Sequence, residues 1–250
     1  MQGTTRYDTK TVAEIVREDY RTADVFKKFG INFCCGGKVS LAEACAVKNV
    51  DMEKLYIEIE NATRTISISN ALPFNQWEIG FLVDYIINVH HAYLKQALPA
   101  IEVNLLSFVS NHRKYHPELQ DLYDAFVTLS AFLQKHNLHE EEIIFPYIKQ
   151  IDNAFRRRES YGNLFVRTLR KPLHAIELEH KRIGDLLESI RRITRQYNYP
   201  EDACTNHRVI FNKLREFDND IVQHKHLEMN VLFPKAIDME KVLLNSEVLG

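Results

Sequence analysis

The sequence predicts an all-α protein, with a small N-terminal helical domain followed by a larger antiparallel four-helix bundle. Apolar residues recur every three or four positions along most of the chain, and no strand-like alternation competes with this pattern. Two motifs of the capping-box type indicate helix starts near the N-terminus. Further along, two copies of His-x3-Glu are each followed by Phe-Pro at the same offset.

Composition and charge exclude several classes of function. The formal net charge of −2 gives no reason to expect nucleic acid or an anionic membrane surface as a partner. No uninterrupted apolar run is long enough to span a bilayer, and the polar first ten residues do not resemble a signal peptide. Four cysteines without a secretion signal favour a reducing compartment, so we expect a cytoplasmic protein.

We expect three segments: a small helical domain over residues 1–65, a linker over 66–76, and the bundle over 77–250. Thr11-x-x-Glu14 and Ser40-x-x-Glu43 are capping boxes, and Asp51 is a further N-cap candidate. A unit of this size buries little apolar surface, so it should dock on the bundle or on a second subunit. Its expected helices cover residues 12–18, 23–29, 41–48 and 51–59.

The small domain also carries two adjacent cysteines, Cys34 and Cys35, followed by Gly36 and Gly37. They precede the helix that Ser40 caps, and a helix N-terminus lowers the pKa of a nearby thiol. This favours a role in redox chemistry or in handling a metal or ligand. The alternatives are a strained vicinal disulfide and two small apolar side chains buried in a tight turn.

The bundle helices carry histidines and glutamates within their apolar seams. On an α-helix, positions i and i+4 share a face, so each His-x3-Glu motif presents an imidazole and a carboxylate together. The second helix has its seam at Phe126, Leu129, Leu133, His136, Glu140 and Ile143. Pro99 should kink the first helix rather than end it. The seam positions with ligand chemistry are His91, His136, Glu140, His180, His224 and Glu228.

A single seam histidine is usually a hydrogen-bonded core residue, but four with two carboxylates require another explanation. Buried carboxylates are costly unless they meet a cation, and neither Glu140 nor Glu228 has a Lys or Arg in its own seam. Six ligands exceed the needs of one ion and suit a dinuclear centre with both carboxylates bridging. Mixed imidazole and carboxylate ligation favours iron, with manganese second and zinc a further alternative.

The remaining candidates have weaker signals. His139 and His226 lie off the seam and are expected on the surface, while His90 is expected to be structural. Glu179, next to His180, could support a ligand from outside the centre, although a solvated carboxylate explains it equally well.

These motifs together resemble the repair-of-iron-centres family, di-iron proteins that help to restore damaged iron–sulfur clusters. Cys34-Cys35-Gly36-Gly37 resembles the motif of that family's N-terminal domain, and the rest resembles a hemerythrin-like domain. The resemblance implies an oxo- or hydroxo-bridged pair of non-haem iron ions, held by the six seam residues. Oxygen-carrying hemerythrins have a His four residues after the third-helix ligand, where this chain has Gly184. The centre should therefore have one imidazole fewer, which argues against a dedicated oxygen carrier.

Three functions stay open from the sequence. The first is an iron donor or repair protein whose partners are damaged iron–sulfur proteins, with Cys34 and Cys35 supplying electrons or receiving metal or a ligand. The second is a reductase for nitric oxide or peroxide. The third is a sensor that binds O2 or NO. A homodimer, in which the small domain docks across to the other subunit, is compatible with each, and nucleic acid or membrane partners are not expected.

Overall fold

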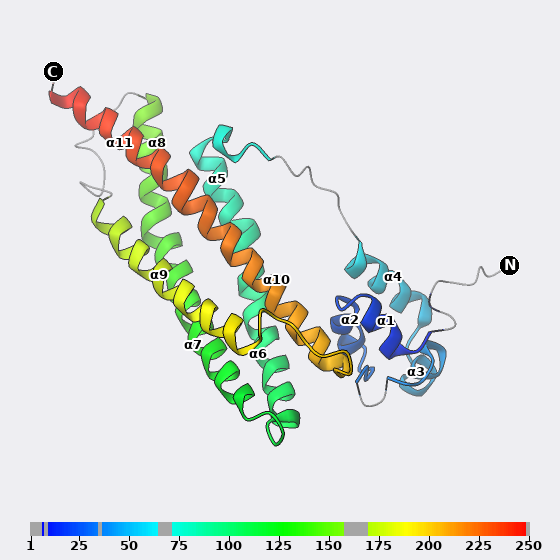
Figure 1. Cartoon of the computed structure of the whole chain (residues 1–250). Coiled ribbons are helices and arrows are strands. Elements are labelled where there is room, and N and C mark those ends of the chain that lie inside the picture. Colours follow the sequence, from blue (N-terminus) through cyan, green and yellow to red (C-terminus); the bar gives the residue numbers. More distant parts are fainter. Residues whose placement is uncertain (1–6, 8–9, 35–36, 65–71, 158–169, 249–250) are drawn as a thin grey trace. The chain divides into compact units, whose positions relative to one another are not determined.

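The computed structural model describes residues 7, 10–34, 37–64, 72–157 and 170–248. The chain divides into two compact units, one of residues 1–70 and 194–215 and one of residues 71–193 and 216–250. The described residues form helices and connecting turns (Figure 1). The β-type backbone pairing among the described residues is an isolated antiparallel bridge between Thr11 and Ser40. The predicted all-α class is confirmed.

The helices of the first unit begin where the sequence places caps. The Thr11 side chain accepts a hydrogen bond from the Glu14 N–H, and the Glu14 carboxylate accepts one from the Thr11 N–H at 2.8 Å. Ser40 and Glu43 form the same reciprocal pair, with 2.9 Å from the Ser40 nitrogen to the Glu43 carboxylate. These helices are α1 (Val12–Glu18), α2 (Thr22–Lys28), α3 (Leu41–Lys48) and α4 (Met52–Thr63).

Apolar side chains from all four short helices form the core of this unit. Phe26, Leu41 and Leu55 are fully buried, and Cys45 lies among them at 2% exposure. Burial raises the pKa of the Cys45 thiol, so it is a poor nucleophile and packs as a small apolar residue. This agrees with its mid-helix position in the sequence.

The second unit consists of long helices that are each interrupted by a short π segment, apart from α9. The first long helix runs through α5 (Ile79–Tyr85), a π segment (Ile86–His91) and α6 (Ala92–His112), and it continues through Pro99. A short turn reverses the chain into α7 (Glu118–His139), which packs against both α6 and α9 (Figure 1). The remaining elements are a π segment (Glu140–Ile144), α8 (Phe145–Arg157), α9 (Arg170–Ile193), α10 (Thr205–Leu227), a π segment (Glu228–Leu232) and α11 (Phe233–Val248). Residues 205–215 of α10 belong to the first unit and the rest of this helix to the second.

Two of the π segments immediately precede the Phe-Pro pairs. Proline has no N–H and its ring clashes with the carbonyl four residues earlier, which disrupts the regular α-helical ladder. Here the Phe145 N–H instead bonds the Glu140 carbonyl five residues back, and Phe233 bonds Glu228 in the same way. A π segment inserts one residue into the helix and rotates the following side chains.

The extra residue makes one predicted core position wrong. Ile143 was expected in the seam of the second bundle helix, but it is 47% exposed, and Ile144 is fully buried instead. The prediction assumed an uninterrupted period of 3.6 residues, and the period breaks at Glu140. From this point Ile144, Phe145 and Ile148 face the apolar cluster formed with α5 and α11.

Candidate metal centre

The four histidines and two glutamates predicted as ligands meet inside the second unit. His91 ends the first π segment, His136 lies in the last turn of α7, and His180 lies in the middle of α9. His224 lies in the last turn of α10, while Glu140 and Glu228 each open a π segment. Each of the six side chains is at most 4% exposed. They are called the six-residue cluster below.

The cluster forms two groups of four, and the two carboxylates belong to both. One group is His91, Glu140, His224 and Glu228, and the other is His136, Glu140, His180 and Glu228. Within each group the candidate ligand atoms lie within 4.8 Å of one another. The shared carboxylates make each group a potential ion position with two imidazoles and two carboxylate oxygens.

The side-chain contacts place imidazole nitrogens where a metal ligand would need them. The Nε2 atoms of His91 and His224 are 3.1 Å apart, and those of His136 and His180 are also 3.1 Å apart. The Glu140 oxygens lie 3.4 Å from Nε2 of His91 and of His136. Glu228 lies 2.7 Å from Nε2 of His224 through Oε1 and 3.2 Å from Nε2 of His180 through Oε2.

The polar atoms of the cluster fit a bound cation. Neither carboxylate oxygen of Glu140 has a hydrogen-bond partner among the described residues, although the side chain is fully buried. A buried, unpaired carboxylate costs several kcal/mol in a protein interior. A divalent or trivalent ion between the two carboxylates would satisfy these oxygens, and mixed imidazole and carboxylate donors suit a first-row transition metal.

The pKa shifts of the buried carboxyl groups also favour a bound cation. Burial, followed by repulsion from Glu228, holds the pKa of the Glu140 carboxyl well above its ordinary value. For Glu228 burial also opposes ionisation, but His224 and His180 outweigh it and lower the pKa of that carboxyl. Burial lowers the pKa of His91 and of His136 to about 4, which leaves both imidazoles neutral at neutral pH, as metal ligands must be.

Carboxylates outside the cluster orient two of its imidazoles. Nδ1 of His91 is 2.7 Å from Oε1 of Glu141, and Nδ1 of His136 is 2.7 Å from Oε2 of Glu179. When Nδ1 carries the proton and donates a hydrogen bond to the carboxylate, the Nε2 lone pair points at the centre of the cluster. Glu179 thus has the supporting position considered from the sequence, but it supports His136 rather than its neighbour His180.

A second supporting contact lies behind His224. The ring of His90 stacks on the ring of His224 with centroids 5.4 Å apart and 4° between the planes. Nδ1 of His90 is 2.9 Å from Oδ1 of Asp220, one turn before His224 on α10. His90 is structural, as expected, and it helps to fix the orientation of a candidate ligand.

Sequence reasoning missed Glu141 and Asp220. The contact of Glu141 with His91 and that of Asp220 with His90 each join two different long helices, so residue spacing within one helix does not predict them. A weak signal was available for Asp220, because it lies four residues before His224 and shares its helix face. The off-seam histidines lie outside the cluster, as predicted: His139 is partly exposed beside Glu179, and His226 is exposed and contacts Asn230.

The other predicted site lies in the first unit and is described only in part. Cys35 and Gly36 lie outside the described residues. Cys34 is half-buried and its backbone N–H donates to Oδ1 of Asn32 at 2.9 Å. Position 37 has room only for glycine, because a Cβ there would lie 2.3 Å from the Phe33 carbonyl oxygen and clash with it.

The bundle and its buried cluster define a metal-binding helical protein of the kind that holds ions between facing helices. Residues 82–236 match the family described as the hemerythrin HHE cation binding domain, and the chain belongs to that family. Residues 8–63 match a second family, ScdA_N, described as a domain of unknown function (DUF542).

Similar proteins cover almost the whole chain. An iron-sulfur cluster repair protein ScdA from Staphylococcus haemolyticus is 29% identical over 224 residues, which is 90% of this chain and 96% of that protein. An iron-sulfur cluster repair protein YtfE from Escherichia coli O157:H7 is 29% identical over 232 residues, which is 92% of this chain and 98% of that protein. A YtfE protein from Shigella boydii is 28% identical over the same length. The resemblance inferred from the motifs is confirmed.

Within the described part of the chain, no helix combines the length and the apolar character needed to cross a membrane.

Proposed function

We propose that this chain repairs damaged iron–sulfur clusters, and that the six-residue cluster holds two non-haem iron ions for this purpose. The observation that carries the proposal is the pair of four-residue groups that share two fully buried carboxylates. Relatives that align over nine-tenths of the chain are named as iron–sulfur cluster repair proteins, which supports the same function here.

The roles of the six residues follow from the two groups. His91 and His224 would bind one iron, His136 and His180 the other, and Glu140 and Glu228 would bridge them. Iron is favoured, with manganese second and zinc a further alternative, because mixed imidazole and carboxylate ligation inside a helical bundle is typical of di-iron proteins. Bound here, iron would supply releasable ions and an open coordination position for a small ligand such as nitric oxide or O2.

The cluster should hold its iron less tightly than an oxygen-carrying hemerythrin. Its donor set has four imidazoles, because Gly184 stands where such a carrier has a fifth. A smaller donor set leaves more of the coordination sphere to exchangeable ligands. This property suits a protein whose iron is cargo for another protein.

The N-terminal domain, proposed to span residues 1–65 before a linker over 66–76 and the bundle over 77–250, would act through its thiols. We propose that Cys34 and Cys35 deliver electrons or receive metal during iron transfer. The partners would be damaged iron–sulfur proteins, met in the cytoplasm. Docking of the small domain within one chain or across a homodimer would serve the same chemistry.

Iron transfer to an apo-ferredoxin tests the proposal. The chain is loaded with ⁵⁷Fe and incubated with apo-ferredoxin, sulfide and thiol, and cluster formation is followed by absorbance and by the ⁵⁷Fe content of the re-isolated ferredoxin. We expect clusters that contain the label, faster than with the same amount of free iron plus the metal-free chain. A ferredoxin without label would contradict iron donation.

Variants assign the roles in the same assay. Cys34→Ser with Cys35→Ser should retain iron but lose transfer, while His139→Ala should retain both. Consumption of nitric oxide or peroxide by the loaded protein over many cycles, without iron transfer, would place the chain among the reductases instead.

A further inference from the structure

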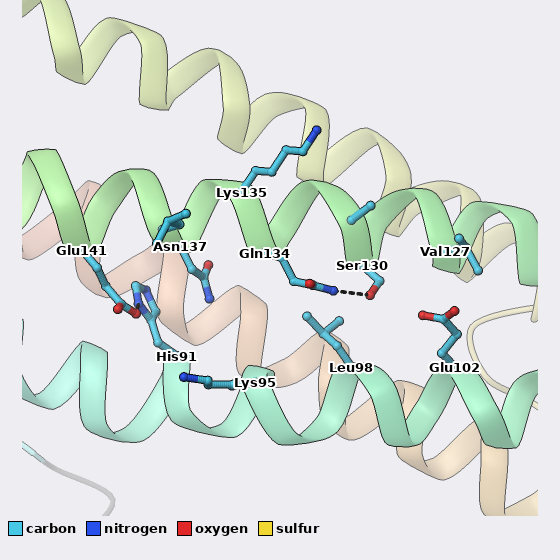
Figure 2. Close-up of a pocket in the computed structure, with 12 residues that line it drawn as sticks. His91, Lys95, Leu98, Glu102, Val127, Ser130, Gln134, Lys135, Asn137 and Glu141 are labelled. Atoms are coloured by element: carbon cyan, nitrogen blue, oxygen red, sulfur yellow. Dashed lines mark hydrogen bonds and ion pairs between the residues drawn. The ribbon is translucent and has the colours of Figure 1, made fainter.

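A pocket of about 660 Å³ lies between α6 and α7 and reaches the six-residue cluster at His91 (Figure 2). Its walls come from one face of each helix, and Glu141, the partner of His91, also lines it. The other cluster residues do not line it. The pocket therefore approaches the ion position of His91 and His224 rather than that of His136 and His180.

The size and lining of the pocket indicate a ligand larger than a diatomic gas. A water molecule occupies roughly 30 Å³, whereas binding sites for small organic molecules occupy about 300–1,000 Å³. This pocket presents the side chains of Lys95, Glu102, Gln134 and Asn137.

Asn137 supplies a hydrogen-bond acceptor that the protein leaves unused. Its side chain is 9% exposed, and its Oδ1 has no hydrogen-bond partner among the described residues. Figure 2 shows the amide pointing from α7 toward α6, into the space beside His91. Buried polar atoms normally have partners, so Oδ1 calls for a donor such as a hydroxyl group.

Charge divides the pocket into two ends. Lys95 extends along α6 toward His91 (Figure 2). Glu141 lies at the same end, with its carboxylate 2.7 Å from Nδ1 of His91, so the ammonium group of Lys95 is the partner that an anionic group of a ligand would meet there. Glu102 lies at the opposite end, beyond Leu98 and near Val127 (Figure 2). An anionic group of a ligand is therefore favoured at the His91 end, beside Lys95.

We propose that the pocket binds a small iron-chelating hydroxycarboxylate. A carboxylate of the ligand would pair with Lys95, its hydroxyl would donate to Oδ1 of Asn137, and the molecule would lie beside His91. Resting on the proposed function, this assigns the pocket as the place where a low-molecular-weight iron carrier meets the cluster. The association is non-covalent and involves no electron transfer.

Equilibrium dialysis of the full-length protein against radiolabelled citrate, in metal-loaded and metal-free form and with the iron content measured afterwards, tests binding directly. We expect about one citrate per chain, with the dissociation constant raised roughly tenfold by Lys95→Ala or Asn137→Leu, as expected for the loss of one charge-assisted or one buried hydrogen bond. Lys114→Ala, an exposed lysine that does not line the pocket, should bind like the parent protein. Tricarballylate, which is citrate without the hydroxyl, should bind to the parent more weakly than citrate does. To Asn137→Leu, tricarballylate and citrate should bind with equal affinity.

The rate of iron release gives a second, independent readout. Release should saturate with citrate concentration, and Lys95→Ala should shift the half-saturating concentration without changing release to the neutral chelator 2,2′-bipyridine. Absence of bound citrate, or equal binding by parent, Lys95→Ala and Asn137→Leu, overturns the proposal. Iron transfer to apo-ferredoxin is measured separately. Transfer without citrate binding refutes the pocket alone, whereas citrate binding without any transfer leaves the pocket standing and refutes the repair function.

Discussion

At the scale of single residues, the geometry gives each member of the six-residue cluster a separate consequence. Glu140 and Glu228 belong to both four-residue groups, while each histidine belongs to one. Loss of a shared carboxylate should therefore affect both ion positions, and loss of a histidine should affect mainly its own.

Glu140→Ala and Glu228→Ala should each reduce bound iron from two ions per chain to less than one. Each substitution removes a ligand from both positions and leaves the other carboxylate without a counterpart. Metal analysis of the purified variants measures the effect, with His139→Ala as a matched control on the same helix turn. Two irons in either glutamate variant would show that the carboxylates do not bridge.

Glu141→Gln should weaken iron binding at the His91 position about 10- to 100-fold, the usual effect of losing a hydrogen-bond partner behind a metal ligand. The Glu141 carboxylate lies 2.7 Å from Nδ1 of His91 and fixes the proton there. Competition with a chelator of known affinity measures the change. Glu142→Gln, at an exposed neighbouring position, should bind iron like the parent. Equal affinities in the two variants would remove Glu141 from the account.

At the scale of helices, local signals in the sequence predicted all four helices of the first unit, although α4 continues to Thr63 instead of ending at residue 59, and they failed at one place in the second. The capping boxes at Thr11 and Ser40 define α1 and α3 to the residue, because the hydrogen bonds that form them are local. The π segments are a different case. A proline in the sequence indicates that the regular hydrogen bonding of the helix is interrupted, but it does not indicate that one residue is inserted. The prediction of Ile143 as a core residue is therefore wrong.

Ser40→Ala should destabilise the small domain by about 1 kcal/mol, because α3 loses its N-cap. The backbone of Ser40, and then its side chain, lower the pKa of the Glu43 carboxyl. A lowered pKa in the folded state adds stability above the unfolded-state pKa, and this stability is lost as the pH falls through the folded-state value. The free energy of unfolding of the parent should therefore fall more steeply below about pH 4 than that of Ser40→Ala. Urea unfolding at several pH values checks this, and identical pH profiles would show that the Ser40 hydroxyl does not contribute to the lowered pKa of Glu43.

At the scale of the whole molecule, the sequence predicted the six candidate ligands that the structure brings together, because each lies in the seam of its own helix, where periodicity can be read. It could not identify Glu141 as the partner of His91, or Asp220 as the partner of His90, because those contacts depend on how two helices align. The α6–α7 pocket could not be predicted from the sequence either, because it depends on how α6 and α7 pack against each other.

Removal of the metal should destabilise the bundle, because the proposed ions would bind the folded state and neutralise two fully buried carboxylates. Ligand present at about a thousand times its dissociation constant contributes roughly 4 kcal/mol, which corresponds to a shift in Tm of roughly 10 °C for a domain of this size. Calorimetry with and without a chelator measures the shift. Glu228→Ala should show almost no response to the chelator, and a response equal to that of the parent would mean that the stabilising ions bind elsewhere.

We propose that the six-residue cluster holds two iron ions in one bridged centre. Mössbauer spectroscopy of the full-length protein loaded with ⁵⁷Fe, combined with metal analysis of the same sample, tests this proposal. We expect two irons per chain with the spectrum of a magnetically coupled pair, lost together in Glu140→Ala. A single isolated iron per chain, or two irons whose spectrum is unchanged in Glu140→Ala, would contradict it.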